Sequence, residues 1–183
     1  MRVIGGIYGG RRLQTPRGLA VRPTSDRLRE TLFDILAPRI EGARFLDICA
    51  GSGAAGIEAL SRGAASCTFV DLSRRACAVI EENLAALDIE DNTVILKRDA
   101  VKALRALAEQ EQQFDIAFFD PPYASGLYSD VMETVARSEL LAPDGLLVVE
   151  HRAKTPPAAE YGDLRIYRHL KQGESGLAFY ARI

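Results

Sequence analysis

The stretch DICAGSGAAGIEAL, residues 47–60, decides the fold, because a glycine-rich turn here joins the end of an apolar strand pattern to the start of a helix pattern. Its glycines at positions 51, 53 and 56 spell G-x-G-x-x-G. The same spelling occurs where helix N–H groups hold the pyrophosphate of a dinucleotide, and also in tight strand-to-helix turns that hold no ligand. The motif therefore predicts a strand, a turn and a helix, and its surroundings must decide the ligand.

Apolar runs alternate with helical patterns from residue 44 onward. The helical patterns cover residues 54–62, 73–87 and 100–109. Strands covered on both faces read as continuous apolar runs, so the alternation predicts parallel strands joined by crossover helices. The runs are residues 44–49, 67–71, 93–97, 114–119 and 145–150.

The end of the chain follows a different pattern. Two strand-like segments, residues 164–170 and 176–183, are separated by only KQGES, which is too short for a crossover helix. They must form an antiparallel hairpin. Five parallel strands followed by a C-terminal antiparallel hairpin are the layout of the α/β class I S-adenosylmethionine-dependent methyltransferase fold, a Rossmann-like variant of the doubly wound sheet.

The start of the chain predicts an arm before this sheet. Residues 2–16 read as two short strand segments punctuated by glycine, typical of a hairpin. Pro23 and the polar residues after it then open a helix with an apolar face. We expect a single domain overall, with a short basic arm over residues 1–23 and the methyltransferase domain over residues 24–183. The apolar face consists of Leu28, Leu32, Phe33, Ile35 and Leu36.

Charge is unevenly distributed along the 183 residues. Residues 1–30 carry seven arginines against two acidic side chains, residues 31–150 carry ten basic against twenty acidic, and residues 151–183 carry six against three. Arginine forms forked hydrogen bonds with phosphate and with base edges. A basic end on an acidic body indicates a polyanionic partner met by one face, and for the N-terminal arginines we favour nucleic acid over a merely solvated arm.

Composition argues against several other classes. No apolar run approaches the roughly 20 residues of a membrane span, and the N-terminus lacks the apolar core of a secretory signal. Cys49, Cys67 and Cys77 fit neither a disulfide framework nor a zinc ligand set, and we expect His151 and His169 to be structural. We expect a cytoplasmic protein that needs neither metal nor membrane.

Acidic residues follow the predicted strands, at the edge where doubly wound sheets bind ligands. Asp71 lies twenty residues after Gly51, where a carboxylate accepts hydrogen bonds from ribose hydroxyls of either NAD or S-adenosylmethionine. Asp47, beside the glycine turn, would repel a phosphate, whereas it suits the sulfonium and ammonium groups of S-adenosylmethionine. We therefore expect S-adenosylmethionine as the cofactor.

Asp99 follows the third strand and has two compatible roles. Its carboxylate can accept a hydrogen bond from the adenine amino group while the Ala100 N–H donates to the ring, and it can also cap the helix that begins at Ala100. The expected cofactor-binding residues are Asp47, Gly51, Ser52, Gly53, Asp71, Leu72, Asp99 and Ala100.

The most specific motif is DPPY, residues 120–123, directly after the fourth strand. Consecutive prolines remove two backbone donors and stiffen the turn. The Asp120 carboxylate and the Pro121 carbonyl could then accept both N–H groups of an exocyclic base amine and stabilise the charge that develops during methyl transfer. Pro122 adds to the rigidity, and Tyr123 could stack on a flipped-out base.

Other transfer chemistries would leave different marks. Methylation at C5 of a pyrimidine needs a cysteine nucleophile, and none of the three cysteines follows a proline in a strand-end loop. The chain also lacks GxxxxGK[ST], so the glycine turn is not a phosphate-binding P-loop.

Taken together, these residues resemble the bacterial small-subunit ribosomal RNA guanine-N2 methyltransferases, the RsmD family. The resemblance runs in order over nearly the whole chain, which makes it more specific than DPPY alone, a motif shared with DNA adenine methyltransferases. The stretches that carry it are residues 2–16, 22–36, 46–64, 69–76, 114–123 and 140–151.

The resemblance implies transfer of a methyl group from S-adenosylmethionine to the 2-amino group of one guanine of 16S rRNA in the small ribosomal subunit. It implies the cofactor and target-amine positions already named, with the arm and RPT, residues 22–24, against RNA. One departure is Ile48-Cys49, where the family usually has leucine and an aromatic residue; we expect only a change in packing there. We expect a monomer, whose RNA-contacting residues are Arg11, Arg12, Arg22, Thr24 and Arg27.

Four other functions remain open. A DNA adenine methyltransferase is disfavoured because 183 residues leave no room for a separate sequence-reading domain. A protein glutamine methyltransferase resembles this pattern with asparagine at position 120. A non-catalytic RNA-binding assembly factor would not need the full set of aspartates. A dehydrogenase stays open through G-x-G-x-x-G and is separated by whether NAD or S-adenosylmethionine protects the protein from heat.

Overall fold

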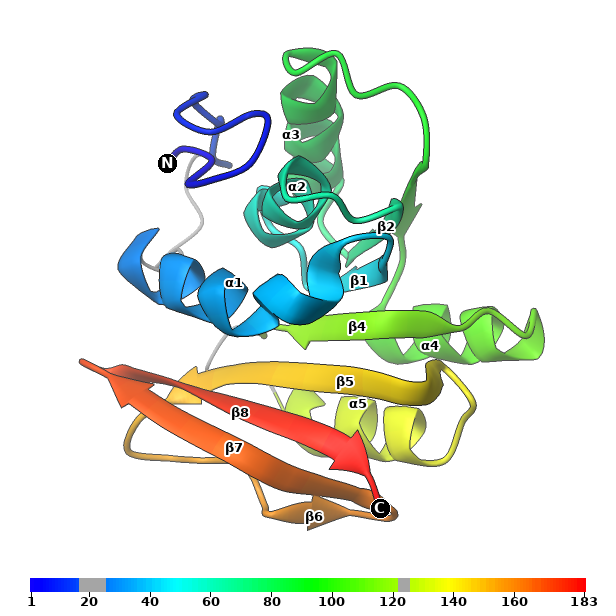
Figure 1. Cartoon of the computed structure of the whole chain (residues 1–183). Coiled ribbons are helices and arrows are strands. Elements are labelled where there is room, and N and C mark those ends of the chain that lie inside the picture. Colours follow the sequence, from blue (N-terminus) through cyan, green and yellow to red (C-terminus); the bar gives the residue numbers. More distant parts are fainter. Residues whose placement is uncertain (17–25, 122–125) are drawn as a thin grey trace.

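The computed structural model describes residues 1–16, 26–121 and 126–183. Over these residues an eight-stranded sheet forms in the order β3-β2-β1-β4-β5-β8-β7-β6 (Figure 1). The first five strands are parallel, as their continuous apolar runs predict. They are β1 (Arg44–Ile48), β2 (Ser66–Asp71), β3 (Thr93–Lys97), β4 (Phe114–Phe119) and β5 (Leu141–Arg152).

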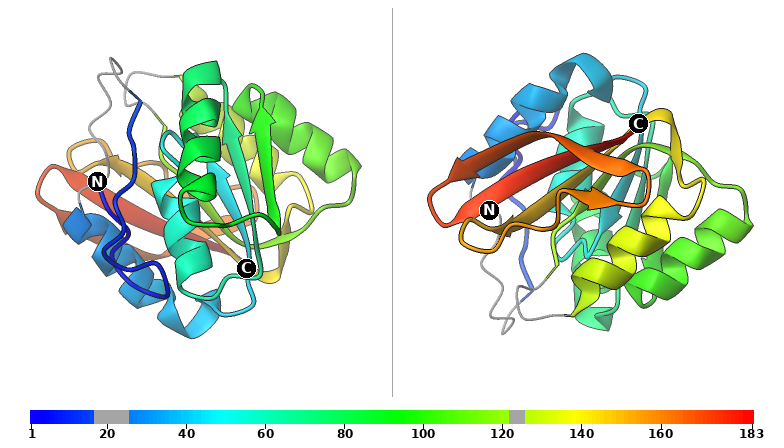
Figure 2. Two further views of the ribbon diagram at one scale, coloured as in Figure 1. Left: turned by 90° about the horizontal axis from the view of Figure 1, so that it is seen from above. Right: turned by 90° about the horizontal axis from the view of Figure 1, so that it is seen from below.

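Five helices among the described residues cover the two faces of the sheet. They are α1 (Asp26–Ile40), α2 (Ala54–Ser61), α3 (Arg74–Ala85), α4 (Ala100–Glu109) and α5 (Leu127–Ala136). Two separate buried apolar clusters result, one on the side of α1, α2 and α3 and the other on the side of α4 and α5. Figure 2 shows α1 and the α4–α5 pair on opposite sides of the strands. The predicted α/β methyltransferase fold is confirmed.

The C-terminal hairpin is confirmed and is longer than predicted. Strand β7 (Leu164–Gln172) pairs antiparallel with β8 (Ser175–Arg182), and β8 pairs antiparallel with β5. Only two residues form the turn, and Gly173 takes a positive φ of 63° there. A two-residue strand, β6 (Glu160–Tyr161), extends the edge of the sheet and was not predicted.

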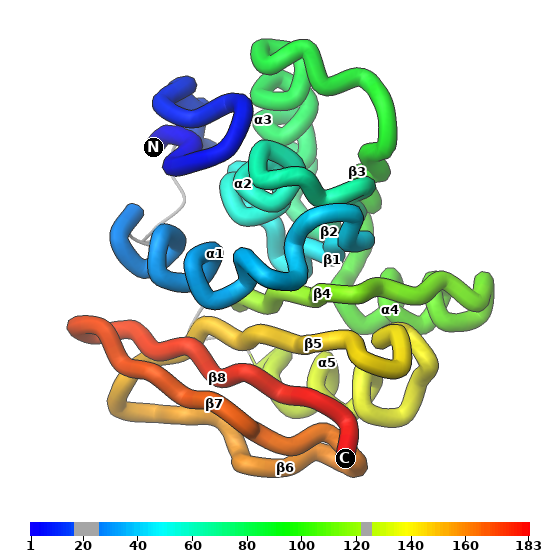
Figure 3. The backbone as a smooth tube through the Cα atoms, in the orientation of Figure 1, coloured from blue at the N-terminus to red at the C-terminus, as the bar shows by residue number. Residues whose placement is uncertain are grey.

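The first sixteen residues fold back on themselves and pack on the body. The Val3 N–H donates to the Arg11 carbonyl at 2.9 Å, and the Gly10 N–H donates to the Val3 carbonyl at 2.9 Å. One antiparallel bridge, between Arg2 and Arg12, takes the place of the two predicted strand segments. The tube in Figure 3 shows this loop beside α2 and above α1, so residues 1–16 lie on the α1–α3 side of the molecule.

Candidate active site

The three glycines of the turn have different surroundings. A Cβ at Gly51 would meet nothing within 4 Å, so the backbone there borders open space. Gly53 caps α2 with a φ of 76°, and Ile80 and Phe69 side chains lie just beyond it. A Cβ at Gly56 would lie 2.3 Å from the ring of Phe69, so this glycine allows α2 to pack closely on β2. Gly51 is the glycine that a ligand can approach.

Asp47 is hydrogen-bonded to the backbone of the helix that follows the glycine turn. Its carboxylate is buried and accepts a hydrogen bond from the Gly56 N–H at 2.9 Å, in the first turn of α2. Burial raises the pKa of Asp47 to about 7, and the nearby charge of Asp71 adds to the rise, while the Gly56 N–H opposes it. Asp47 is therefore a proton-sensitive group within the turn.

Asp71 ties the end of β2 to the glycine turn. One of its carboxylate oxygens accepts from the Gly51 N–H at 2.9 Å, and the other accepts from the Ser73 N–H at 2.8 Å. Leu72, the next residue, has 71% of its surface exposed, which is unusual for leucine and leaves an apolar surface beside this carboxylate. A flat, partly apolar ring with hydroxyl groups beside it would match both side chains.

The third strand ends as its sequence predicts. Asp99 is the N-cap of α4, and its carboxylate accepts from the Lys102 N–H at 3.1 Å. Ala100 is the first residue of the helix and is buried. The capping role predicted for Asp99 is confirmed, and its carboxylate is only partly covered.

Cys49 marks the point where the strand-end carboxylates meet. It directly follows β1 and takes a positive φ of 65°, an uncommon conformation for a residue with a side chain. Burial raises the pKa of its thiol, and four surrounding carboxylates raise it further. These four are Asp71, Asp120, Asp47 and Asp99. The structure thus gathers the acidic residues predicted from four strand ends into one negative cluster.

Asp120 continues from β4 beside the end of β1. Its backbone N–H donates to the Ile48 carbonyl at 3.3 Å, and Pro121 next to it is buried. Pro122 and Tyr123, predicted as catalytic, lie outside the described residues, as do Arg22 and Thr24, predicted to contact RNA. Asp120 and Pro121 are therefore the part of DPPY that the structure places beside the cluster.

Three anchors of the arm, Glu58, Ser61 and Asn83, were not predicted from the sequence. Glu58, on α2, is fully buried and accepts from the Ile4 and Gly5 N–H groups at 2.7 and 2.8 Å. Ser61 accepts from the Tyr8 N–H at 2.9 Å. The sequence carries one indication of such a contact, because Glu58 is a lone carboxylate within the apolar run of residues 54–60.

Asn83, on α3, connects the arm with the glycine turn. It is buried, accepts from the Gln14 N–H at 2.7 Å, and donates to the carbonyls of Gln14 and Ser52 at 3.1 and 3.0 Å. Arg11 donates to the Ala86 carbonyl at 3.0 Å near the end of α3, and both Arg11 and Arg12 are exposed. Residues 1–16 are therefore joined to the candidate cofactor turn through Asn83 of α3.

Comparisons with known proteins identify the family of the chain. Residues 1–181 match the family described as "Conserved hypothetical protein 95". The chain is 37% identical over 182 residues to "Putative rRNA methyltransferase YlbH" of Bacillus subtilis, covering 100% of this chain and 99% of that protein. It is also 37% identical over 191 residues to "Ribosomal RNA small subunit methyltransferase D" of Escherichia coli K12, covering 96% and 93%.

Solved structures share the fold. The structure titled "Putative methyltransferase yhhF from Escherichia coli" superposes with a TM-score of 0.84 at 36% identity, over 100% of this chain and 97% of that one. A more distant structure, "SMU.776, a putative methyltransferase complexed with SAH", has a TM-score of 0.69 at 16% identity, over 85% of this chain and 49% of that one. At that identity the likeness establishes the fold alone.

Proposed function

The chain belongs to the Conserved hypothetical protein 95 family, and from this premise we propose that it is an S-adenosylmethionine-dependent methyltransferase of small-subunit ribosomal RNA. The proposed target is the exocyclic 2-amino group of one guanine in 16S rRNA. The names of the two relatives support ribosomal RNA as the substrate class. The observation that carries the proposal is the cluster of four strand-end carboxylates around Cys49, beside the open backbone of Gly51.

This cluster fits S-adenosylmethionine. When bound, the cofactor supplies a methyl group activated by the positive charge of a sulfonium. The negative cluster favours a cationic ligand, and the open space at Gly51 leaves room for its chain. We assign Asp71 to the ribose hydroxyls, Leu72 to the adenine face, and Asp99 with the Ala100 N–H to the adenine edge. Asp47, Ser52 and Gly53 shape the turn.

Asp120 and Pro121 are proposed to hold the target amine. An exocyclic amine is weakly nucleophilic because its lone pair is delocalised into the ring. Hydrogen bonds from its two N–H groups to the Asp120 carboxylate and the Pro121 carbonyl favour a pyramidal nitrogen and stabilise its developing positive charge. Holding the nitrogen in line with the methyl group lowers the barrier further by orientation. Pro122 stiffens the turn, and Tyr123 stacks on the flipped-out base.

The basic arm is proposed to contact the RNA. We treat residues 1–23 as the arm and residues 24–183 as the methyltransferase domain, and we assign Arg11, Arg12, Arg22, Thr24 and Arg27 to the rRNA. The packing of residues 1–16 against α2 and α3 supports this assignment, because it keeps the arm close to the glycine turn. RNA held there would lie near the catalytic residues.

The proposal is tested by methyl transfer from labelled S-adenosylmethionine. Unmethylated small ribosomal subunits, naked rRNA and duplex DNA are offered side by side, and the labelled base is identified. We expect label on N2 of one guanine of 16S rRNA. Label on DNA adenine would contradict the substrate, and absence of label from all three would contradict the activity.

A variant separates catalysis from cofactor binding. Asp120→Ala should lose transfer while keeping the affinity of the wild type for S-adenosylhomocysteine, measured by calorimetry. An equal loss of cofactor affinity would show that Asp120 acts at the cofactor instead of the amine.

A further inference from the structure

A groove runs between the exposed flank of α1 and strand β7, outside the candidate active site. Its volume is about 670 Å³. The α1 side is formed by Arg27, Thr31, Asp34 and Ile35, and the β7 side by Arg168, Leu170, Lys171 and Gln172. Apolar side chains thus line both walls, and long charged side chains surround them.

The charge of this groove is positive. Arg27, Arg168 and Lys171 are exposed, and none of them forms an ion pair with another described residue. The lone carboxylate, Asp34, lies 3.5 Å from Arg62, which partly neutralises it. The guanidinium of Arg168 lies 6.0 Å from the centre of the Phe179 ring, which restricts its orientation. An anion would meet uncompensated cations on both walls.

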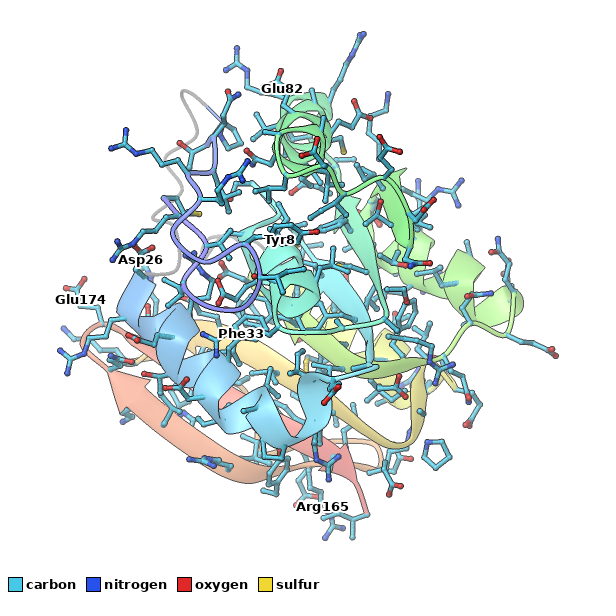
Figure 4. All side chains as sticks on the ribbon, turned by 45° about the horizontal axis from the view of Figure 1, so that its top comes forward. Tyr8, Asp26, Phe33, Glu82, Arg165 and Glu174 are labelled. Atoms are coloured by element: carbon cyan, nitrogen blue, oxygen red, sulfur yellow. The ribbon has the colours of Figure 1, made fainter. Side chains whose placement is uncertain are left out.

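Strand pairing places this groove at the edge of the sheet that carries the active site. Val149 of β5 pairs with Phe119 of β4, just before Asp120. Further along, Arg152 of β5 pairs with Ser175, which pairs with Gln172 at the end of β7. Figure 4 shows Asp26, where α1 begins, and Glu174, in the β7–β8 turn, on the same side of the molecule. The groove therefore opens at the carboxyl ends of β4 and β5.

The fold brings the two basic ends of the chain together here. The N-terminal 30 residues and the last 33 residues both carry excess positive charge, whereas the segment between them is strongly acidic. Arg27 comes from the first basic segment, and Arg168 and Lys171 come from the second. The positive charge of the groove therefore comes from both basic segments.

Resting on the proposed function, we infer that the groove between α1 and β7 binds the sugar–phosphate backbone of the substrate rRNA that extends away from the target guanine. Arg27 and Arg168 can each hold a phosphate with two hydrogen bonds, and Lys171 supplies a further charge. Ile35 and Leu170 provide apolar surface for ribose. The groove adds affinity and orientation without touching the reacting amine.

The test compares two double variants of equal charge. Arg168→Gln/Lys171→Gln removes cations from the groove, whereas Arg105→Gln/Arg137→Gln removes cations that lie along α4 and α5, on the opposite face of the sheet. Binding of naked small-subunit rRNA is measured at several salt concentrations. Each lost phosphate contact reduces the magnitude of the negative slope of log affinity against log salt by about 0.7 to 0.9. We expect a loss of about 1.4 to 1.8 for the groove variant and no change for the control.

Two further measurements keep the result interpretable. Affinity for S-adenosylhomocysteine should equal that of the wild type in both double variants, which shows that the fold is intact. Lys171→Gln alone leaves the Arg168–Phe179 contact in place. It should reduce the magnitude of the salt-dependence slope by about half as much as the double groove variant does.

The possible outcomes are distinct. An unchanged slope in the groove variant, with wild-type rRNA binding intact, would overturn the groove assignment and leave the proposed function standing. Weaker binding of whole subunits with unchanged binding of naked rRNA would indicate a ribosomal protein as the partner, and would also overturn it. Failure of the wild type to bind both naked rRNA and whole small subunits would overturn the proposed function, and the groove assignment with it.

Discussion

Asp47 shows how one buried carboxylate can link the cofactor turn to pH. Its pKa of about 7 means that it is partly protonated at neutral pH in the free protein. A cationic ligand nearby favours the ionised form and lowers this pKa. Binding of S-adenosylmethionine should therefore release a fraction of a proton near pH 7 and should tighten as the pH rises from 6 to 8.

Calorimetry in two buffers of different ionisation enthalpy measures this proton release. Asp47→Asn is the control, because its side-chain oxygen can still accept from the Gly56 N–H but cannot ionise. We expect no proton release and a flatter pH dependence in that variant. Equal proton release in wild type and variant would assign the titration to another group.

Gly51 and Gly56 both belong to the G-x-G-x-x-G motif, but their substitution should change different properties: stability for Gly56 and cofactor affinity for Gly51. Gly56→Ala places a Cβ 2.3 Å from the ring of Phe69 and 2.5 Å from the Cys67 sulfur, both on β2. Such overpacking costs about 1–3 kcal/mol, so its free energy of unfolding in urea should fall by that amount. Gly51→Asn, at a φ of 58° that asparagine tolerates, should fold nearly normally and instead lose cofactor affinity, because its side chain fills the open space. Equal destabilisation in both would contradict this division.

At the scale of elements, Asn83 of α3 joins the arm to the turn before α2. Asn83→Ala removes a donor and an acceptor and leaves the Gln14 backbone and the Ser52 carbonyl without this partner. Each buried group left unpaired costs about 1–3 kcal/mol. We expect faster amide hydrogen exchange in the arm, at residues 3–14, together with weaker cofactor binding. Asn92→Ala, at an exposed asparagine with a positive φ, controls for general destabilisation. Normal arm protection in Asn83→Ala would refute the connection.

The joint between β5 and the hairpin contains a pair of histidines. The Nε2 atoms of His151 and His169 lie 2.9 Å apart, and the Nδ1 of His151 lies 2.7 Å from the Arg152 carbonyl. A carbonyl only accepts, so Nδ1 of His151 carries the hydrogen, and its Nε2 accepts from His169. Burial lowers the pKa of His151, with the charges of His169 and Lys171 adding to the effect.

The sign of the resulting pH dependence follows from linkage. The unfolded chain binds this proton near pH 6.5, while the folded chain binds it only at lower pH. The contribution to stability is therefore complete above pH 6.5 and is lost as the pH falls through the folded pKa. When the pH falls from 7 to 5, the free energy of unfolding of His151→Phe should decrease less than that of the wild type. His169→Gln keeps a donor toward His151 but removes the charge of His169, so its loss should lie between those of His151→Phe and wild type. A loss in His151→Phe as large as in wild type would contradict the assignment.

The elements show which parts of the fold a sequence can reveal. Helix α4 begins and ends where its periodicity predicts, because an apolar stripe and an N-cap aspartate mark it. The ends of β7 and β8 were missed, since Lys171 and Gln172 are polar edge-strand residues that carry no apolar signal. Ser175 was missed because it is polar, although β8 pairs there with both β5 and β7. Buried elements leave a pattern of apolar residues in the sequence, whereas hydrogen-bond pairing at an exposed strand edge leaves no such pattern.

At the scale of the whole molecule, some residues of the candidate site could likewise be predicted from the sequence and others could not. Asp71 and Asp99 could be predicted because parallel strands bring their carboxyl ends to one edge. The anchors Glu58 and Asn83 could not, because each binds backbone groups more than 50 residues away in the chain. The groove between α1 and β7 likewise exists only after both ends of the chain have met.

The whole molecule should also respond to the ligand that its glycine turn selects. Any ligand that binds only the folded state raises stability, by about 2.7 kcal/mol at a concentration of 100 times its Kd. For a chain of this size that corresponds to a rise in Tm of about 5 to 11 °C. S-adenosylhomocysteine should produce this shift, whereas NAD should produce none, because Asp47 beside the turn opposes a pyrophosphate. Gly51→Asn is the control that should abolish the shift without lowering the starting Tm by a comparable amount. A shift with NAD alone would mean that the G-x-G-x-x-G turn serves a dinucleotide, and that the acidic cluster has been assigned the wrong ligand.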